Sequence, residues 1–116
     1  LMTPEPMLRA DPISVRRILE NLVANAVDAA APSGHVECRV RPGAPGEVVI
    51  EIADSGAGMT PEELKRAFDD FFTTKPHGTG LGLSVVRRLV SDLGGSLAVE
   101  TAVGKGTTFR VELPTT

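Results

Sequence analysis

Gly78-Thr79-Gly80-Leu81-Gly82-Leu83-Ser84 places three glycines in five residues, where a run with helical periodicity, Leu81 to Leu93, begins. Glycine has no Cβ, so it permits positive φ angles and lets a ligand approach the backbone closely. The first N–H groups of a helix have no partner within the helix, and the helix dipole is positive at that end. The stretch therefore predicts an anion site, most often for phosphate, although glycine also caps helices and turns hairpins.

Length and composition describe one globular domain. The 116 residues are 41% hydrophobic and 23% charged, which is typical of a folded domain with its own core. The net charge of −3 argues against a nucleic-acid surface, and it suggests that a metal ion would help to neutralise any polyphosphate ligand. Cys38 is the only cysteine, which excludes an intrachain disulfide, and we expect it to be a small buried residue in a strand.

Apolar periodicity predicts helices and antiparallel strands along the chain. The first helix should present one apolar face, made of Val15, Leu19, Leu22, Ala26 and Ala29. The expected elements are, in order, a helix from Asp11-Pro12 to Ala30, strands His35–Arg41 and Val48–Ile52, a capped helix from Thr60 to Phe68, a helix from Leu81 to Gly94-Gly95, and strands Ser96–Thr101 and Thr107–Leu113. We therefore predict a single domain over residues 1–116, a two-layer α/β sandwich with a mixed, mainly antiparallel sheet backed by helices.

Two asparagines share one side of the first expected helix. Asn21 and Asn25 are four residues apart, so they lie one turn apart and away from the apolar stripe. Asparagine competes with the backbone for hydrogen bonds and is a poor residue inside a helix, so the pair calls for a reason. Amide oxygens can ligate Mg²⁺, a hard ion that bridges phosphates, but a solvated helix face explains the spacing as well.

A carboxylate followed by two glycines ends the second expected strand, in Asp54-Ser55-Gly56-Ala57-Gly58-Met59. Such a carboxylate can point into a cleft and accept a hydrogen bond from an amino group such as that of adenine. Glycine keeps the backbone thin enough for a flat base to lie against it. An ordinary Asp-Gly turn accounts for these residues equally well when they are taken alone.

Taken in order, the motifs resemble those of sensor histidine kinases. The resemblance extends from Asp11 to Pro114 and implies the Bergerat ATP-binding fold of the GHKL superfamily, in a catalytic domain that uses ATP and Mg²⁺. The matching motifs are the N box at Glu20 to Ala26 (Glu-Asn-Leu-Val-Ala-Asn-Ala), the first glycine box at Asp54 to Gly58, the F box at Phe68 to Lys75, the second glycine box at Gly78 to Leu83, and the terminal glycine turn at Gly104 to Thr107.

The resemblance also implies roles for single residues. Asn25 would ligate Mg²⁺, and Asn21 would face the phosphates or the waters of the ion, so that both act in catalysis. Asp54 would select adenine, with Gly56 and Gly58 beneath the ring. The implied nucleotide-binding residues are Asn21, Asn25, Asp54, Gly56, Gly58, Met59, Lys75, Gly78, Thr79, Gly80, Leu81, Gly82, Leu83 and Thr108, the last through a water near the adenine.

The segment between the F box and the second glycine box departs from the family. Phe71 and Phe72 would anchor a lid, unless they are simply core aromatics, and the lid has only five residues, Thr73 to His77. Asp28 stands where some relatives carry a basic residue that touches phosphate. Lys75 would supply that charge, or it is a solvated lysine.

The residue four positions before Asn25 distinguishes the chemistries of the superfamily. Members that hydrolyse ATP, and the anti-sigma serine kinases, carry a glutamate there, which can activate water or a serine hydroxyl. This chain has Asn21, which cannot accept a proton, and the adjacent Glu20 is rotated by ~100° around the helix. We therefore expect transfer of the γ-phosphoryl group of ATP to a histidine. The alternatives are a nucleotide-binding regulatory module and a GHKL-type ATPase or serine kinase without histidine transfer.

Neither histidine of the chain fits the phosphate acceptor of the family, which lies on a separate helical hairpin in a His-Glu or His-Asp context. His35 precedes Val36 in an expected strand, and His77 lies in the lid. We therefore expect the acceptor domain outside this chain, a response regulator as the next recipient, no nucleic-acid partner, and homodimers only through the hairpin. No apolar run reaches the ~20 residues that span a bilayer, so we expect a cytoplasmic domain. Whether the full-length protein is membrane-anchored is left open.

Overall fold

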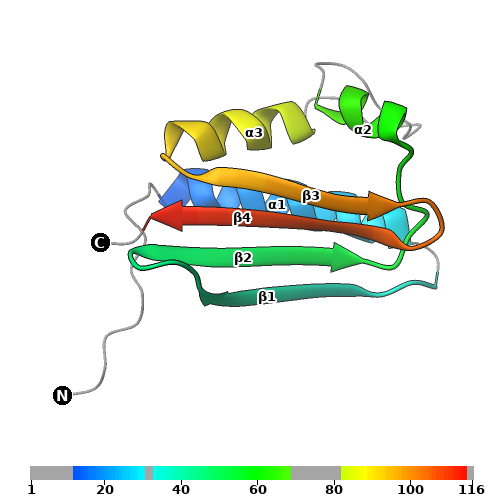
Figure 1. Cartoon of the computed structure of the whole chain (residues 1–116), viewed down its shortest axis with the longest axis horizontal. Coiled ribbons are helices and arrows are strands. Elements are labelled where there is room, and N and C mark those ends of the chain that lie inside the picture. Colours follow the sequence, from blue (N-terminus) through cyan, green and yellow to red (C-terminus); the bar gives the residue numbers. More distant parts are fainter. Residues whose placement is uncertain (1–11, 31–32, 69–81, 115–116) are drawn as a thin grey trace.

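The protein folds as a layer of helices on one face of an antiparallel sheet, in a computed structural model that describes residues 12–30, 33–68 and 82–114 (Figure 1). The elements are, in order, α1 (Pro12–Ala30), β1 (Val36–Pro42), β2 (Glu47–Asp54), α2 (Pro61–Ala67), α3 (Gly82–Asp92), β3 (Ser96–Ala102) and β4 (Gly106–Pro114). They match the expected elements in type and order, and their ends differ by one or two residues where the structure describes them.

The sheet has four strands in the order β1-β2-β4-β3, and all three pairings between these described strands are antiparallel. Figure 1 shows that α1 runs behind the sheet and that α3 lies next to β3. The register pairs Ile52 of β2 with Phe109 of β4, and Phe109 with Val99 of β3, so these three side chains point to the same face. The predicted two-layer sandwich with a mainly antiparallel sheet is confirmed.

The core lies between the helices and the two central strands. Its buried members are Ile18, Leu22 and Ala26 of α1, Val48, Ile50 and Ile52 of β2, Val86 and Val90 of α3, and Phe109, Val111 and Leu113 of β4. One part of the predicted α1 face is wrong, because Ala29 is exposed whereas Ile18 and Ala30 are buried. Ile18, Leu22, Ala26 and Ala30 are spaced four residues apart and form the row that meets the sheet.

Strand β1 is an edge strand that the helices leave uncovered. All seven of its residues are exposed, including the apolar Val36 and Val40 at 38% and 66%. Cys38 is also exposed, so its predicted burial is wrong. It pairs with Ile52, which is fully buried, so the two residues point to the same face. The difference arises because the buried core is built on β2 and β4, one strand further in.

Helix α2 begins with the predicted capping box. Thr60 Oγ1 accepts from the Glu63 N–H at 3.1 Å, and Glu63 Oε1 accepts from the Thr60 N–H at 2.9 Å, with Pro61 at the first helical position.

None of the helices that the structure describes has the length and apolar character that crossing a membrane requires.

The packing predicts a sharp contrast between two apolar residues on neighbouring strands. Ile52→Ala should lower the free energy of unfolding by about 2–5 kcal/mol, because the side chain is fully buried between sheet and helices. Val40→Ala, at an exposed site on β1, should change it by no more than about 0.5 kcal/mol. Urea unfolding followed by circular dichroism measures both, and equal losses would contradict the assignment of β1 to an uncovered edge.

Candidate functional site

A row of polar side chains crosses the helix-bearing face at one end of the sheet. Asp54 ends β2 and pairs with Thr107 of β4, which pairs in turn with Thr101 of β3. Directly opposite residues on neighbouring strands point to the same face, so the three side chains lie side by side, one row beyond Ile52, Phe109 and Val99. Asp54 and Thr101 are half-buried and Thr107 is only 6% exposed. The apolar core therefore ends in a carboxylate next to two hydroxyl groups.

The loop that follows Asp54 fixes the carboxylate. The Gly56 N–H donates to Asp54 Oδ1 at 2.8 Å. This hydrogen bond uses one of the two carboxylate oxygens, and Asp54 itself is half-buried. A short turn of this kind holds an aspartate side chain by its own backbone and leaves one acceptor for a ligand.

Glycines let the loop pass between α1 and the β3–β4 hairpin. A Cβ on Gly56 would lie 2.3 Å from the Ala29 carbonyl oxygen, and one on Gly58, at φ 72°, would lie 2.0 Å from that of Ala102. Gly106, at φ 90°, approaches from the hairpin, since its Cβ would lie 2.0 Å from the Asp54 carbonyl oxygen. Contacts this short exclude every residue except glycine. Close packing of these backbone segments against one another therefore explains why glycine stands at positions 56, 58 and 106. The predicted place of Gly56 and Gly58 beneath a base stays a prediction.

The polar side of α1 meets the start of α3. Asn21 and Asn25 are half-buried, which disfavours the alternative of a solvated helix face. Asn21 Oδ1 lies 3.9 Å from the position that a Cβ on Gly82 would occupy, and Gly82 is the first residue of α3. The structure thereby brings the asparagine motif next to the end of the glycine-rich motif, although 60 residues of chain lie between them.

The sequence-predicted site residues are only partly described. Gly82 and Leu83 are half-buried in the first turn of α3, and the Met59 N–H donates to Thr101 Oγ1 at 2.9 Å. The other predicted residues of the lid and glycine box lie outside the described residues: Phe71, Phe72, Lys75, His77, Gly78, Thr79, Gly80 and Leu81.

The two threonines of β4 point to opposite faces. Thr107 shares a face with Asp54, whereas Thr108 pairs with Ala53 and lies on the open face of the sheet. Thr108, the residue named from the sequence, is therefore not brought together with Asp54, and Thr107 is the residue that sequence reasoning missed. The two-residue repeat of a strand was the available signal, because Phe109 and Val111 predict that Thr107 points to the core side.

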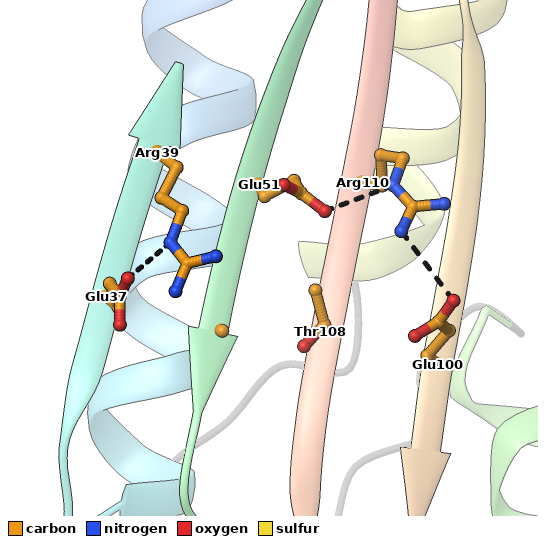
Figure 2. A pocket seen from close by; sticks show the side chains of 7 residues that line it. Glu37, Arg39, Glu51, Glu100, Thr108 and Arg110 are labelled. Carbon is orange, nitrogen blue, oxygen red and sulfur yellow. Dashed lines mark hydrogen bonds and ion pairs between the residues drawn. The ribbon is translucent and has the colours of Figure 1, made fainter. Parts of the chain in front are cut away.

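The open face carries a separate hollow of about 210 Å³, lined mainly by charged residues (Figure 2). Glu51 lies between two cations, with Oε1 accepting from Arg41 at 3.2 Å and Oε2 from Arg110 at 3.1 Å. The hydrogen bonds from Arg41 and Arg110 hold the pKa of Glu51 below its usual range. Arg110 also lies 3.6 Å from Glu100, and Arg39 is paired with Glu37. Because the charges are paired with one another, this hollow is not the anion site that the sequence predicts.

The described residues fit a nucleotide-bound Mg²⁺ better than a metal site made by the protein alone. The described residues contain no group of three or more histidine, cysteine, aspartate or glutamate side chains that could hold a metal. Mg²⁺ keeps most of its waters and often takes one or two protein oxygens together with substrate phosphates. A half-buried asparagine such as Asn25 has an amide oxygen of the kind that such an ion accepts.

Comparison with known proteins identifies the family. Residues 10–116 match the family described as histidine kinase-, DNA gyrase B- and HSP90-like ATPases. The chain belongs to this ATPase family. Its fold is that of the catalytic domain of histidine kinases. The mycobacterial sensor histidine kinase MprB superposes with a TM-score of 0.84, at 31% sequence identity, over 93% of this chain and 76% of that one. Full-length ShkA in complex with AMPPNP also gives a TM-score of 0.84, at 35% identity, over 97% of this chain and 24% of that one.

A curated relative places the domain among sensor kinases. The sensor histidine kinase ZraS of Klebsiella oxytoca is 44% identical over 115 residues, which is 97% of this chain. The chain spans about a quarter of the length of that relative, because the aligned residues make up 25% of it. This chain is thus an ATP-binding catalytic domain of the histidine kinase type, as its motifs indicate.

Glycine substitutions should separate backbone strain from steric contact. Gly46→Ala, at φ 82° with nothing within 4 Å of its Cβ position, should cost about 1–2 kcal/mol of stability and leave ATP affinity unchanged. Gly106→Ala adds a clash with the Asp54 carbonyl oxygen, so it should cost more and weaken ATP binding. Urea unfolding and titration with a fluorescent ATP analogue measure the two effects. Equal affinities in the two variants would show that Gly106 has no part in shaping the site.

Proposed function

We propose that this domain binds Mg²⁺–ATP and transfers the γ-phosphoryl group to a histidine on a helical-hairpin domain of the same kinase, from which it passes to an aspartate of a response regulator. The observation that carries the proposal is the approach of Asn21, on the polar side of α1, to Gly82 at the start of α3. It brings Asn21, one turn before the proposed metal ligand Asn25, to the helix end proposed for the phosphates.

The adenine end of the site consists of Asp54 and Thr107. The carboxylate accepts from the exocyclic amine of adenine, a charge-assisted hydrogen bond, while its other oxygen is held by the Gly56 N–H. Thr107 lies beside Asp54 on the next strand and can hydrogen-bond to the ring nitrogen next to the amine, directly or through a water. Met59, Gly56 and Gly58 form the loop against which the base packs.

The phosphate end of the site is formed by α1 and the start of α3. The N–H groups in the first turn of α3, at Gly82 and Leu83, have no partner within the helix and favour anionic oxygens. The proposal extends this contact to Gly78, Thr79, Gly80, Leu81 and Lys75. Asn25 supplies an amide oxygen to Mg²⁺, and Asn21 faces the phosphates or the waters of the ion. When bound, Mg²⁺ neutralises charge on the β- and γ-phosphates.

The absence of a base at position 21 supports histidine as the acceptor. A neutral imidazole nitrogen carries a free lone pair, so it can attack the γ-phosphorus without a residue that removes its proton. The new N–P bond forms as the bond to the β–γ bridging oxygen breaks, and ADP leaves with that electron pair. A serine hydroxyl or water would need a proton acceptor such as glutamate, and Asn21 offers an amide instead. This disfavours ATP hydrolysis and serine phosphorylation, and the intact nucleotide motifs disfavour a purely regulatory module.

The kinase activity is tested by mixing this chain with the helical-hairpin domain of its full-length protein and γ-labelled ATP. The expected product is a label on the hairpin that is stable in base and lost in acid, as phosphohistidine is. Asn25→Ala should abolish the Mg²⁺-dependent label and change thermal stability without nucleotide only slightly, because the side chain is outside the buried core. Arg17→Ala, on the exposed side of α1, is the control and should label normally. Acid-stable label, or phosphate release without label, would overturn histidine transfer.

The adenine contact is tested by Asp54→Asn. The asparagine oxygen can still accept from the Gly56 N–H, which turns the side-chain NH₂ toward the adenine amine, donor against donor. ATP affinity should fall about tenfold or more, and the preference for ATP over GTP should narrow, because guanine presents an acceptor at that position. Competition titrations with ATP and GTP measure the ratio, and an unchanged ratio would rule out Asp54 as the base selector.

A further inference from the structure

Thr101 of β3 joins three parts of the adenine end of the site through one hydroxyl group. Its Oγ1 accepts from the Met59 N–H at 2.9 Å, lies 2.8 Å from Thr107 Oγ1, and lies 3.2 Å from the Gly106 carbonyl oxygen. The first contact ties it to the loop after Asp54, and the other two tie it to β4. Within the described part of the chain, every buried side-chain nitrogen and oxygen has a hydrogen-bond partner.

The proton count at this hydroxyl restricts what Thr107 can do. A threonine hydroxyl has one proton to donate, and the Gly106 carbonyl can only accept. The proton of Thr101 therefore goes either to Gly106 or to Thr107. The 2.8 Å separation from Thr107 is the usual O–H···O distance, whereas 3.2 Å to Gly106 is longer than such bonds normally are. Thr101 can donate to Gly106 while it accepts from Thr107, or it can donate to Thr107, and only this second arrangement frees the proton of Thr107.

Donation in this direction leaves the proton of Thr107 for the ligand. Thr107 then acts as a donor beside the acceptor Asp54, its cross-strand partner. Adenine presents a donor, its amine, next to an acceptor, its N1, and guanine presents the reverse, a carbonyl oxygen next to an N–H. An acceptor and a donor side by side thus match adenine and mismatch guanine. If Thr107 instead donated to Thr101, it would offer only lone pairs, and this half of the discrimination would be lost.

We propose that Thr101 is a positioning residue for base selection, which makes Thr107 a hydrogen-bond donor toward adenine while holding the Asp54 loop by the Met59 N–H. The proposal rests on the proposed function, since it deepens the adenine site described there. It assigns a role to a residue of β3 that need not touch the nucleotide.

The test is a set of nucleotide titrations on the purified chain, with ATP and GTP competing against a fluorescent nucleotide. Thr101→Val keeps the shape of the side chain and removes the hydroxyl. It should weaken ATP about three- to tenfold, the size expected for one neutral hydrogen bond, and weaken GTP less. Thr101→Ser restores the hydroxyl and should restore the preference for ATP. Ser96→Ala, which removes a hydroxyl from the exposed start of the same strand, is the control and should leave both affinities unchanged.

A double-mutant cycle with Thr107→Val decides whether Thr101 acts through Thr107. In the Thr107→Val background, Thr101→Val should cause no further loss of preference for ATP, because the donor that it orients is already gone. Equal losses for ATP and GTP, or additive losses in the double variant, would overturn the proposal and leave Thr101 with a purely structural role. Should Thr101→Val fail to fold, Thr101→Ala and Thr101→Ser supply the same comparison.

Wild-type binding keeps this proposal separate from the one on which it rests. If the wild-type chain binds neither nucleotide, or binds both equally, the adenine site itself is wrong. If the wild type prefers ATP and Thr101→Val keeps that preference in full, only the role of Thr101 is wrong.

Discussion

The site depends on backbone segments that approach one another more closely than any side chain allows. The loop after Asp54 passes between the end of α1 and the β3–β4 hairpin, and at Gly56, Gly58 and Gly106 a Cβ would lie 2.0–2.3 Å from a carbonyl oxygen. These contacts hold the Asp54 carboxylate at the end of its strand. Because β2 is a central strand of the sheet, the position of that carboxylate follows from the register of the whole fold.

The sheet divides its chemistry between two faces by the two-residue repeat of its strands. One face is apolar under α1 and α3 and ends in the row Asp54, Thr107 and Thr101, where the core gives way to polar groups. The other face is a set of paired charges around Glu51, with no apolar layer against it in the described residues. The same strands therefore build both the core and one wall of the site, so that stability and the geometry of the site are set by the same register.

Much of the fold could be predicted because its signals are local. The capping box at Thr60, the apolar residues of β2 and the glycine turns each act within a few residues, so the types and order of the elements were confirmed. The two wrong predictions, the burial of Cys38 and of Ala29, depend on which elements pack against these residues. Cys38 lies in an alternating strand, but its burial depends on whether a helix covers β1, and Ala29 differs from Ala30 only in which of them faces the sheet.

By itself, the sequence determined which chemical groups the candidate site offers: two asparagines one helical turn apart, an aspartate before a glycine-rich loop, and glycines at the start of a helix. Motif order sufficed for this, because each motif needs only its own spacing. Only the tertiary structure decided which groups meet. It put Asn21 beside Gly82, chose Thr107 rather than Thr108 as the neighbour of Asp54, and linked Thr101 to Met59. Those contacts join residues far apart in the chain, and they follow from strand pairing and helix packing, which no local pattern specifies.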